Sequence, residues 1–163
     1  MRFLFSMKLI DHLVVRMGRV TRDYLASLAL QNEDMLRELM FLIQSGNQTQ
    51  RMKASWVLSG VRKLNPEVLK SYYPVLITCL KNEKVGGVKR ELLRSFEGGS
   101  MSDELEEELI VITMGWVTDE HQDLAVRYVC YRLLAPLLKR YPELQMELSQ
   151  QVDLYRMKFG KFP

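Results

Sequence analysis

The chain has 163 residues, 47% of them apolar and 26% charged, with a formal net charge of +3 at pH 7. This composition excludes a disordered or fibrous protein and fits one globular domain of ordinary size. The apolar start Arg2-Phe3-Leu4-Phe5 is interrupted by Lys8 and Asp11 before a secretory core or a membrane span of about 20 residues can form. We therefore expect a cytoplasmic protein with no membrane partner.

Helical signals begin early and define a first pair of helices. Residues 1–31 are expected to form two short helical segments joined near Gly18. Asn32 is a favourable N-cap for a helix that Gly46-Asn47 ends. After that turn, residues 48–64 carry an apolar face and contain no acidic residue, which predicts a second helix.

The next pair opens with Asn65-Pro66-Glu67, which combines an N-cap, a proline at the first helical position and an acid in the first turn. We predict a helix over 66–81, with a kink at Pro74 because proline lacks a donor and clashes with the preceding turn. Gly86-Gly87 is expected to break the chain, and a partner helix is expected within 84–97.

A third pair follows. Ser102 is the N-cap of an acid-rich helix over 103–117, and the next helix is expected from about Glu120 until Pro136 bends or ends it. Tyr141-Pro142-Glu143 then starts a last helix.

The register between these units indicates a repeat. The spacing is 33, 36 and 39 residues along the first helices and 35 and 37 along the second, measured between Leu36, Leu69, Leu105 and Leu144 and between Val57, Leu92 and Val129. A period in the thirties with one hairpin per unit is typical of an α-solenoid. We predict an all-α fold of about three stacked hairpins plus flanking helices. Residues 32–157 would be the repeat domain, 1–31 an N-terminal segment packed on it, and 158–163 a C-terminal tail.

Several short segments carry a family resemblance. Asp123-Leu124-Ala125-Val126-Arg127 resembles the D-x-x-V-R opening of the second, or B, helix of a HEAT repeat, and residues 51–58 resemble another copy. Together with Gly87-Val88-Lys89-Arg90 and Tyr141-Pro142-Glu143-Leu144, they resemble a group of small, uncharacterised bacterial HEAT-like proteins over residues 32–155. The resemblance implies a right-handed α-α superhelix of the HEAT or armadillo type, with its B helices on the concave surface.

Some members of that group carry the name adenylosuccinate lyase, which does not suit this chain. Such lyases are far larger and have a glycine-rich signature loop and catalytic histidines. The chain has no matching loop, and neither His12 nor His121 lies in such a setting.

We predict no catalytic site, no metal site and no cofactor. Two histidines and two isolated cysteines cannot make the spaced cluster that a zinc site requires. Cys79 and Cys130 lie in apolar stretches, where a thiol packs as a small hydrophobic group. The acidic run 103–108 lies at a helix N-terminus, where carboxylates offset unsatisfied N–H groups.

The charges are divided between the two kinds of helix. The B helices (48–64, 84–97 and 120–140) hold twelve basic and four acidic residues, whereas the first, or A, helices (33–45, 66–81, 103–117 and 142–157) have a net charge of −8. The predicted register places Ser55, Arg90 and Arg127 in one row and Ser59, Arg94 and Tyr131 in the next. The candidate binding strip consists of Arg51, Arg62, Arg90, Arg94, Arg127 and Tyr131.

Guanidinium groups with a tyrosine among them suit carboxylates and phosphates. We therefore expect a non-enzymatic interaction module that holds an acidic protein segment on a basic concave face. One alternative is nucleic-acid binding, by analogy with alkylpurine glycosylases of similar architecture, for which Glu91 beside Arg90 and Tyr128 would be the catalytic candidate. Another is that the two layers of opposite charge only attract each other. The apolar stripe of residues 144–155 also allows a homodimer through the end helix.

Overall fold

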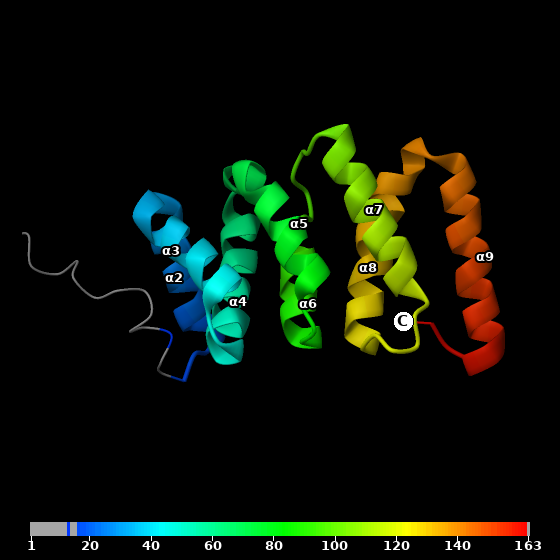
Figure 1. Ribbon diagram of the computed structural model, residues 1–163, viewed down its shortest axis with the longest axis horizontal. Coiled ribbons are helices and arrows are strands. Elements are labelled where there is room, and N and C mark those ends of the chain that lie inside the picture. The colour runs from blue at the N-terminus through cyan, green and yellow to red at the C-terminus, as the bar shows by residue number, and fades with distance from the viewer. Residues whose placement is uncertain (1–12, 14–15, 163) are drawn as a thin grey trace, which may run out of the picture.

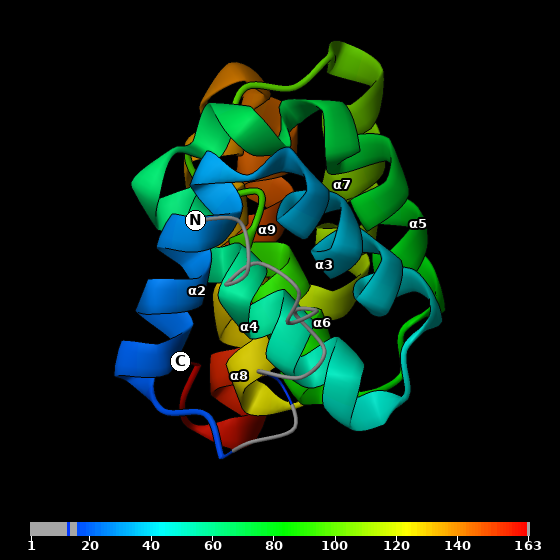
Figure 2. The same ribbon diagram turned by 90° about the vertical axis from the view of Figure 1, so that its left-hand side faces the viewer.

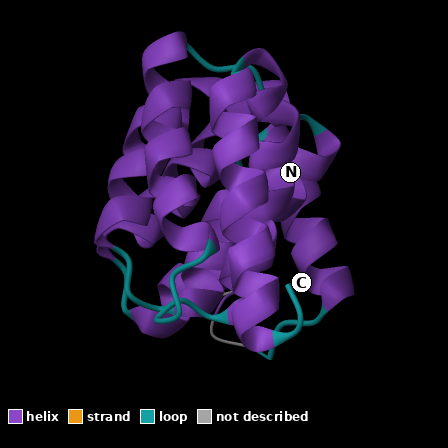
Figure 3. Ribbon diagram, turned by 90° about the vertical axis from the view of Figure 1, so that its right-hand side faces the viewer, coloured by secondary structure: helices purple, strands orange, loops and turns teal. Residues whose placement is uncertain are grey.

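The computed structural model describes residue 13 and residues 16–162, and every regular element within them is helical (Figure 3). The elements are α2 (Arg19–Gln31), α3 (Glu33–Ser45), α4 (Gln48–Leu64), the 3-10 helix η1 (Pro66–Tyr72), α5 (Tyr73–Asn82), α6 (Gly86–Arg94), α7 (Asp103–Val117), α8 (Leu124–Leu137), the 3-10 helix η2 (Leu138–Arg140) and α9 (Pro142–Phe159). They follow one another along the long axis of the molecule from α2 to α9 (Figure 1).

The helices form two layers, which the end-on view separates (Figure 2). In the layer that we call the B layer, α4 packs on α2 and on α6, and α6 packs on α8. The other layer, the A layer, contains α3, η1 with α5, and α7, each joined to its partner as a hairpin. The predicted α-solenoid is therefore confirmed, with the hairpins α3/α4, α5/α6 and α7/α8 flanked by α2 and α9. Of the two short segments predicted in residues 1–31, the one before Gly18 lies almost entirely outside the described residues.

The predicted caps and the predicted kink are present. The Asn32 carboxamide accepts the N–H of Asp34 at 3.0 Å, and the Ser102 hydroxyl accepts the N–H of Leu105 at 3.4 Å. Asn65 caps η1 in the same way, through the N–H of Glu67. Pro74 interrupts the expected helix over 66–81, which divides into η1 and α5, because proline cannot continue the hydrogen bonds of the first turn.

Two boundaries were predicted wrongly. Gly86-Gly87 does not break the chain, because Gly86 is the first residue of α6. The break comes earlier, where the Glu83 carboxylate accepts the N–H groups of Lys84 and Val85, both at 2.9 Å. Likewise, α8 begins at Leu124 rather than near Glu120, because Asp119 accepts the N–H of His121 and closes a turn there.

The core lies between the two layers and along the B layer. The B-layer row of Val57, Leu92 and Val129 is fully buried, as the register predicts, and Leu36 and Leu69 are buried as well. The later members of the A-layer row, Leu105 and Leu144, pack against the core but remain partly exposed. α8 continues through Pro136 and ends one residue later.

Polar side chains join each repeat to the next. The contacts span 32 to 35 residues along the chain and connect Arg51 with Glu83, Ser59 with Glu91, Lys89 with Gln122, Arg62 with Glu97, and Glu97 with Arg132. Neighbouring repeats are thus tied by hydrogen bonds as well as by apolar packing. None of the helices in the described part of the chain combines the length and the apolar character needed to cross a bilayer.

Candidate functional site

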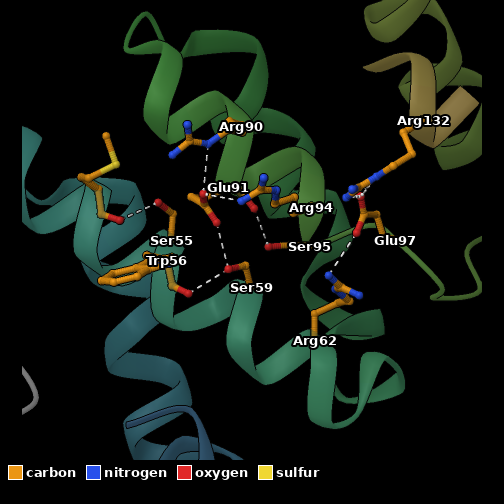
Figure 4. Close-up of polar contacts among 11 residues, drawn as sticks. Ser55, Trp56, Ser59, Arg62, Arg90, Glu91, Arg94, Ser95, Glu97 and Arg132 are labelled. Atoms are coloured by element: carbon orange, nitrogen blue, oxygen red, sulfur yellow. Dashed lines mark hydrogen bonds and ion pairs between the residues drawn. The ribbon is translucent and has the colours of Figure 1, made fainter. Parts of the chain in front are cut away.

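Glu91 on α6 is a buried carboxylate that holds two arginines of the candidate strip. Its side chain is 2% exposed. It accepts hydrogen bonds from Arg90 Nε at 3.2 Å and from Arg94 Nη1 at 3.0 Å (Figure 4). The Ser59 hydroxyl on α4 donates to its other oxygen at 2.9 Å. The carboxylate therefore fixes both guanidinium groups, each of which keeps more than a third of its side chain exposed.

Glu97, in the turn after α6, holds a second pair of arginines. Arg62 of α4 donates to one carboxylate oxygen at 3.0 Å, and Arg132 of α8 donates to the other through Nε at 3.0 Å (Figure 4). These bonds raise the pKa of the Arg132 guanidinium, which stays charged. The carboxylate thus connects three consecutive B-layer helices.

The two carboxylates belong to one surface of the B layer. We call it the B face and define it by Arg62, Arg90, Arg94, Glu97, Tyr128 and Arg132, with Glu91 beneath them. Four arginines face two carboxylates there, so the B face keeps a surplus of positive charge. The acidic partners of these arginines lie in the B layer itself. The positive charge of the B face is therefore not neutralised by ion pairs with the acidic A layer.

Arg127 takes a different place from the exposed arginines. It is 7% exposed, and its guanidinium stacks at 4.6 Å from the centre of the Tyr155 ring on α9. Its Nε and Nη1 atoms are buried and have no hydrogen-bond partner among the described residues. Arg127 therefore points into the seam between α8 and α9 rather than onto the B face.

Tyr131 also faces the C-terminal end of the stack. Its ring packs edge-on against Phe162 at 5.3 Å, and Phe162 in turn contacts Tyr155 at 5.6 Å. Phe162 is 9% exposed, so the segment after α9 covers the end of the B layer. Of the predicted strip, Tyr131 and Arg127 belong to this aromatic seam.

Arg51 lies apart from the other strip residues. It is near the start of α4, eleven residues and about 16 Å along the helix from Arg62. It donates to Glu83 at 2.9 Å and to the Gly46 carbonyl at 3.0 Å, and it lines a groove of about 700 Å³ between α3 and α5. The structure therefore brings Arg62, Arg90 and Arg94 together and leaves Arg51 elsewhere.

One basic residue of α6 is buried where the prediction expects its neighbour. Ser55 and Arg127 are buried, and the buried residue at the matching place on α6 is Lys89, at 9% exposure, rather than Arg90. The Lys89 ammonium lies 4.6 Å from the centre of the Trp116 ring and donates to Gln122 at 2.8 Å. Arg90 is consequently turned toward the B face.

The arrangement around Glu91 does not resemble the base of a glycosylase. Such a base needs access to a cleft, whereas Glu91 is enclosed and accepts three hydrogen bonds from neighbouring side chains. Burial raises the pKa of the Cys130 thiol to about 12, and burial, followed by the charge of Glu83, raises that of Cys79. Thiols of this kind are poor nucleophiles. Within the described residues, no three His, Cys, Asp or Glu side chains gather where a metal ion could bind.

The sequence prediction missed two residues of this surface, Arg132 and Glu97, and assigned Glu91 a different role, as a catalytic candidate. Arg132 and Glu97 lie 35 residues apart, which is the repeat spacing, so the period could have paired them. The role of Glu91 as the acceptor for Arg94 follows from their separation of three residues on one helix. The sequence gives no comparable signal for the burial of Lys89.

A comparison with known families agrees with this architecture. The model of the HEAT repeat domain matches residues 9–161. No curated protein and no solved structure matches the chain. HEAT repeats generally mediate protein–protein interaction, and the family is typically a non-enzymatic scaffold. Because the match spans nearly the whole chain, the protein belongs to the HEAT repeat domain family.

Proposed function

We propose that this protein is a non-enzymatic interaction module whose B face holds an acidic segment of a partner protein. The observation that carries the proposal is the way Glu91 and Glu97 fix four part-exposed arginines on three adjacent helices. Each carboxylate is shared between two guanidinium groups, so donors remain for a ligand. Fixed guanidinium forks lose little conformational freedom when they bind a second carboxylate.

The acidic partner follows from the chemistry of the face. Guanidinium groups match carboxylates in pairs of hydrogen bonds, and complementary charge speeds association and selects the partner. Arg90, Arg94 and Arg132 each keep at least 35% of the side chain exposed, so a chain lying across α6 and α8 reaches all three.

The test is a fluorescence anisotropy titration of a labelled glutamate-rich peptide, with labelled single-stranded and duplex DNA in parallel. The informative variant is Arg90→Gln with Arg132→Gln. It removes one arginine from each carboxylate and leaves Arg94 with Glu91 and Arg62 with Glu97. The matched control is Arg37→Gln with Arg156→Gln, which removes the same charge from exposed positions on α3 and α9.

We expect the peptide to bind at low salt and the B-face variant to weaken binding by about tenfold, while the control stays within about twofold. Equal affinity in the B-face variant and the wild type would overturn the proposal. So would the absence of peptide binding at low salt. If duplex DNA binds instead, with an affinity that falls linearly in log salt and drops in the same variant, the module serves nucleic acid.

A further inference from the structure

A pocket between the end of α6 and the second half of α8 adds a specificity element to the B face. We infer that it receives an aromatic side chain of the bound segment, with acidic residues on either side of that side chain. The inference rests on the proposed function. The pocket measures about 450 Å³ and is lined by Phe96, Glu97, Gly98, Gly99, Arg132, Leu133, Pro136, Leu137 and Arg140. Its size lies within the range of about 300–1,000 Å³ that is usual for ligand pockets.

The pocket is continuous with the B face through two shared residues. Glu97 and Arg132 line the pocket and also belong to the arginine cluster described above. A segment that pairs with Arg90 and Arg94 on α6 therefore reaches the pocket mouth at the end of the same helix.

On the α6 side, two consecutive glycines contribute only backbone to the wall of the pocket, beside Phe96 and Glu97. Gly98 has a φ of +77°, a conformation that side chains rarely adopt. At Gly99 a Cβ atom would lie 1.7 Å from the Tyr73 hydroxyl, so no side chain fits there. The Cβ position of Gly98 faces open space, and neither glycine adds a side chain to the pocket, so a planar ring can approach the backbone closely on this side.

The opposite wall offers apolar contact and a hydrogen-bond acceptor. Leu133 and Leu137 line it, and Phe96, another lining residue, packs against Tyr73 with ring centres 5.1 Å apart. Pro136 has no N–H, so the helical hydrogen bond to the Arg132 carbonyl four residues earlier is missing. An aromatic residue with a polar edge, such as tryptophan, fills the apolar space and supplies a donor.

Two arginines at the rim specify what surrounds the aromatic ring. Arg132 and Arg140 are 46% and 59% exposed in their side chains and are ion-paired with Glu97 and Glu106. Guanidinium groups in this position stack on an aromatic ring and pair with neighbouring carboxylates. The fitting ligand is therefore an acidic stretch with one aromatic residue in its middle.

The experiment compares two labelled peptides that differ at one position. One is the glutamate-rich peptide with a central tryptophan, and the other has alanine in its place. Both are titrated against the wild-type chain and against Pro136→Trp, whose added ring occupies the pocket while the helix regains an N–H donor. Ala125→Trp is the matched control, because it adds the same ring to an exposed position of α8 away from the pocket.

We expect the tryptophan peptide to bind the wild type about tenfold more tightly than the alanine peptide. Pro136→Trp should abolish this ratio and leave the weaker affinity of the alanine peptide unchanged, whereas Ala125→Trp should preserve the ratio. If both peptides bind the wild type equally, or if Pro136→Trp keeps the ratio, the pocket inference is wrong and the acidic-segment function stands. If neither peptide binds, both fail.

Discussion

The hydroxyl of Ser59 on α4 lies 2.9 Å from the buried carboxylate of Glu91 on α6. This contact crosses from one repeat to the next at the centre of the B layer. A buried carboxylate is costly unless it is paired and fully hydrogen-bonded, and Glu91 meets that requirement through Ser59, Arg90 and Arg94. The same group that stabilises the repeat interface therefore also orients the arginines of the candidate site.

Glu91→Gln should lower the free energy of unfolding by about 2 kcal/mol, because the neutral amide no longer compensates two arginines and presents donors to donors. The measurement is denaturation in urea monitored by circular dichroism. Glu108→Gln, which breaks the exposed pair with Lys81, serves as the control and should change stability by less than about 0.5 kcal/mol. Equal losses of unfolding free energy in the two variants would show that the hydrogen bonds of Glu91 contribute no more stability than an exposed ion pair.

Tyr73→Phe should raise the free energy of unfolding by about 1 kcal/mol. The Tyr73 side chain is fully buried and its hydroxyl has no hydrogen-bond partner among the described residues. The change removes an unsatisfied donor and keeps the ring against Phe96. Tyr24→Phe, at an exposed position of α2, is the comparison and should have no effect beyond about 0.5 kcal/mol. A loss of stability in Tyr73→Phe would mean that an internal water or another partner satisfies the hydroxyl.

Arg127→Met should leave the protein as stable as the wild type or more stable, by up to about 1 kcal/mol. Methionine retains the contact with the Tyr155 ring and removes a guanidinium whose Nε and Nη1 are buried without a hydrogen-bond partner in the described part of the chain. Arg127→Lys keeps the charge and loses the planar stacking, so it should be less stable than Arg127→Met. Thermal unfolding of the wild type and the two variants gives their order of stability. If Arg127→Met is the less stable variant, the Arg127 guanidinium is paired in solution.

Acid should weaken the contact between the first two hairpins, because it protonates the Glu83 carboxylate that pairs with Arg51. Burial by itself raises the pKa of this carboxyl, but the hydrogen bonds from Arg51, Val85 and Lys84 outweigh burial and place the pKa below its ordinary value of 4.5. The ionised group therefore contributes stability above that ordinary value, and the contribution is lost as the pH falls through the lowered pKa. Unfolding free energies measured from about pH 6 to about pH 3 should fall more steeply for the wild type than for Glu83→Gln. Parallel curves would contradict this role.

The helices and their order could be predicted because their signals are local. Asn32, Asn65 and Ser102 cap the helices that follow them, and Pro74 divides a helix, through contacts within a few residues. The repeat was visible because buried valines and leucines recur where each B helix packs on the next.

The details of the candidate site depend on contacts between neighbouring repeats. Which side chains meet there could not be predicted from the sequence. The loops between helices differ in length, and on α6 it is Lys89 rather than Arg90 that is buried, although Leu92 keeps its place in the core. The sharing of Glu97 between Arg62 and Arg132 requires three helices to be in place at once. The sequence places Arg127 on the exposed strip, because nothing in the local sequence shows that α9 covers it.

The polar contacts that span 32 to 35 residues connect each hairpin only to its immediate neighbour. In such a stack the curvature is the sum of small rotations at successive joints. A small rotation at the Glu97 contacts, which connect α4 with α8 through the turn after α6, therefore changes the distance between the two ends of the stack. A segment bound across α4, α6 and α8, as proposed above, would fix these rotations and with them the distance between the two ends of the stack.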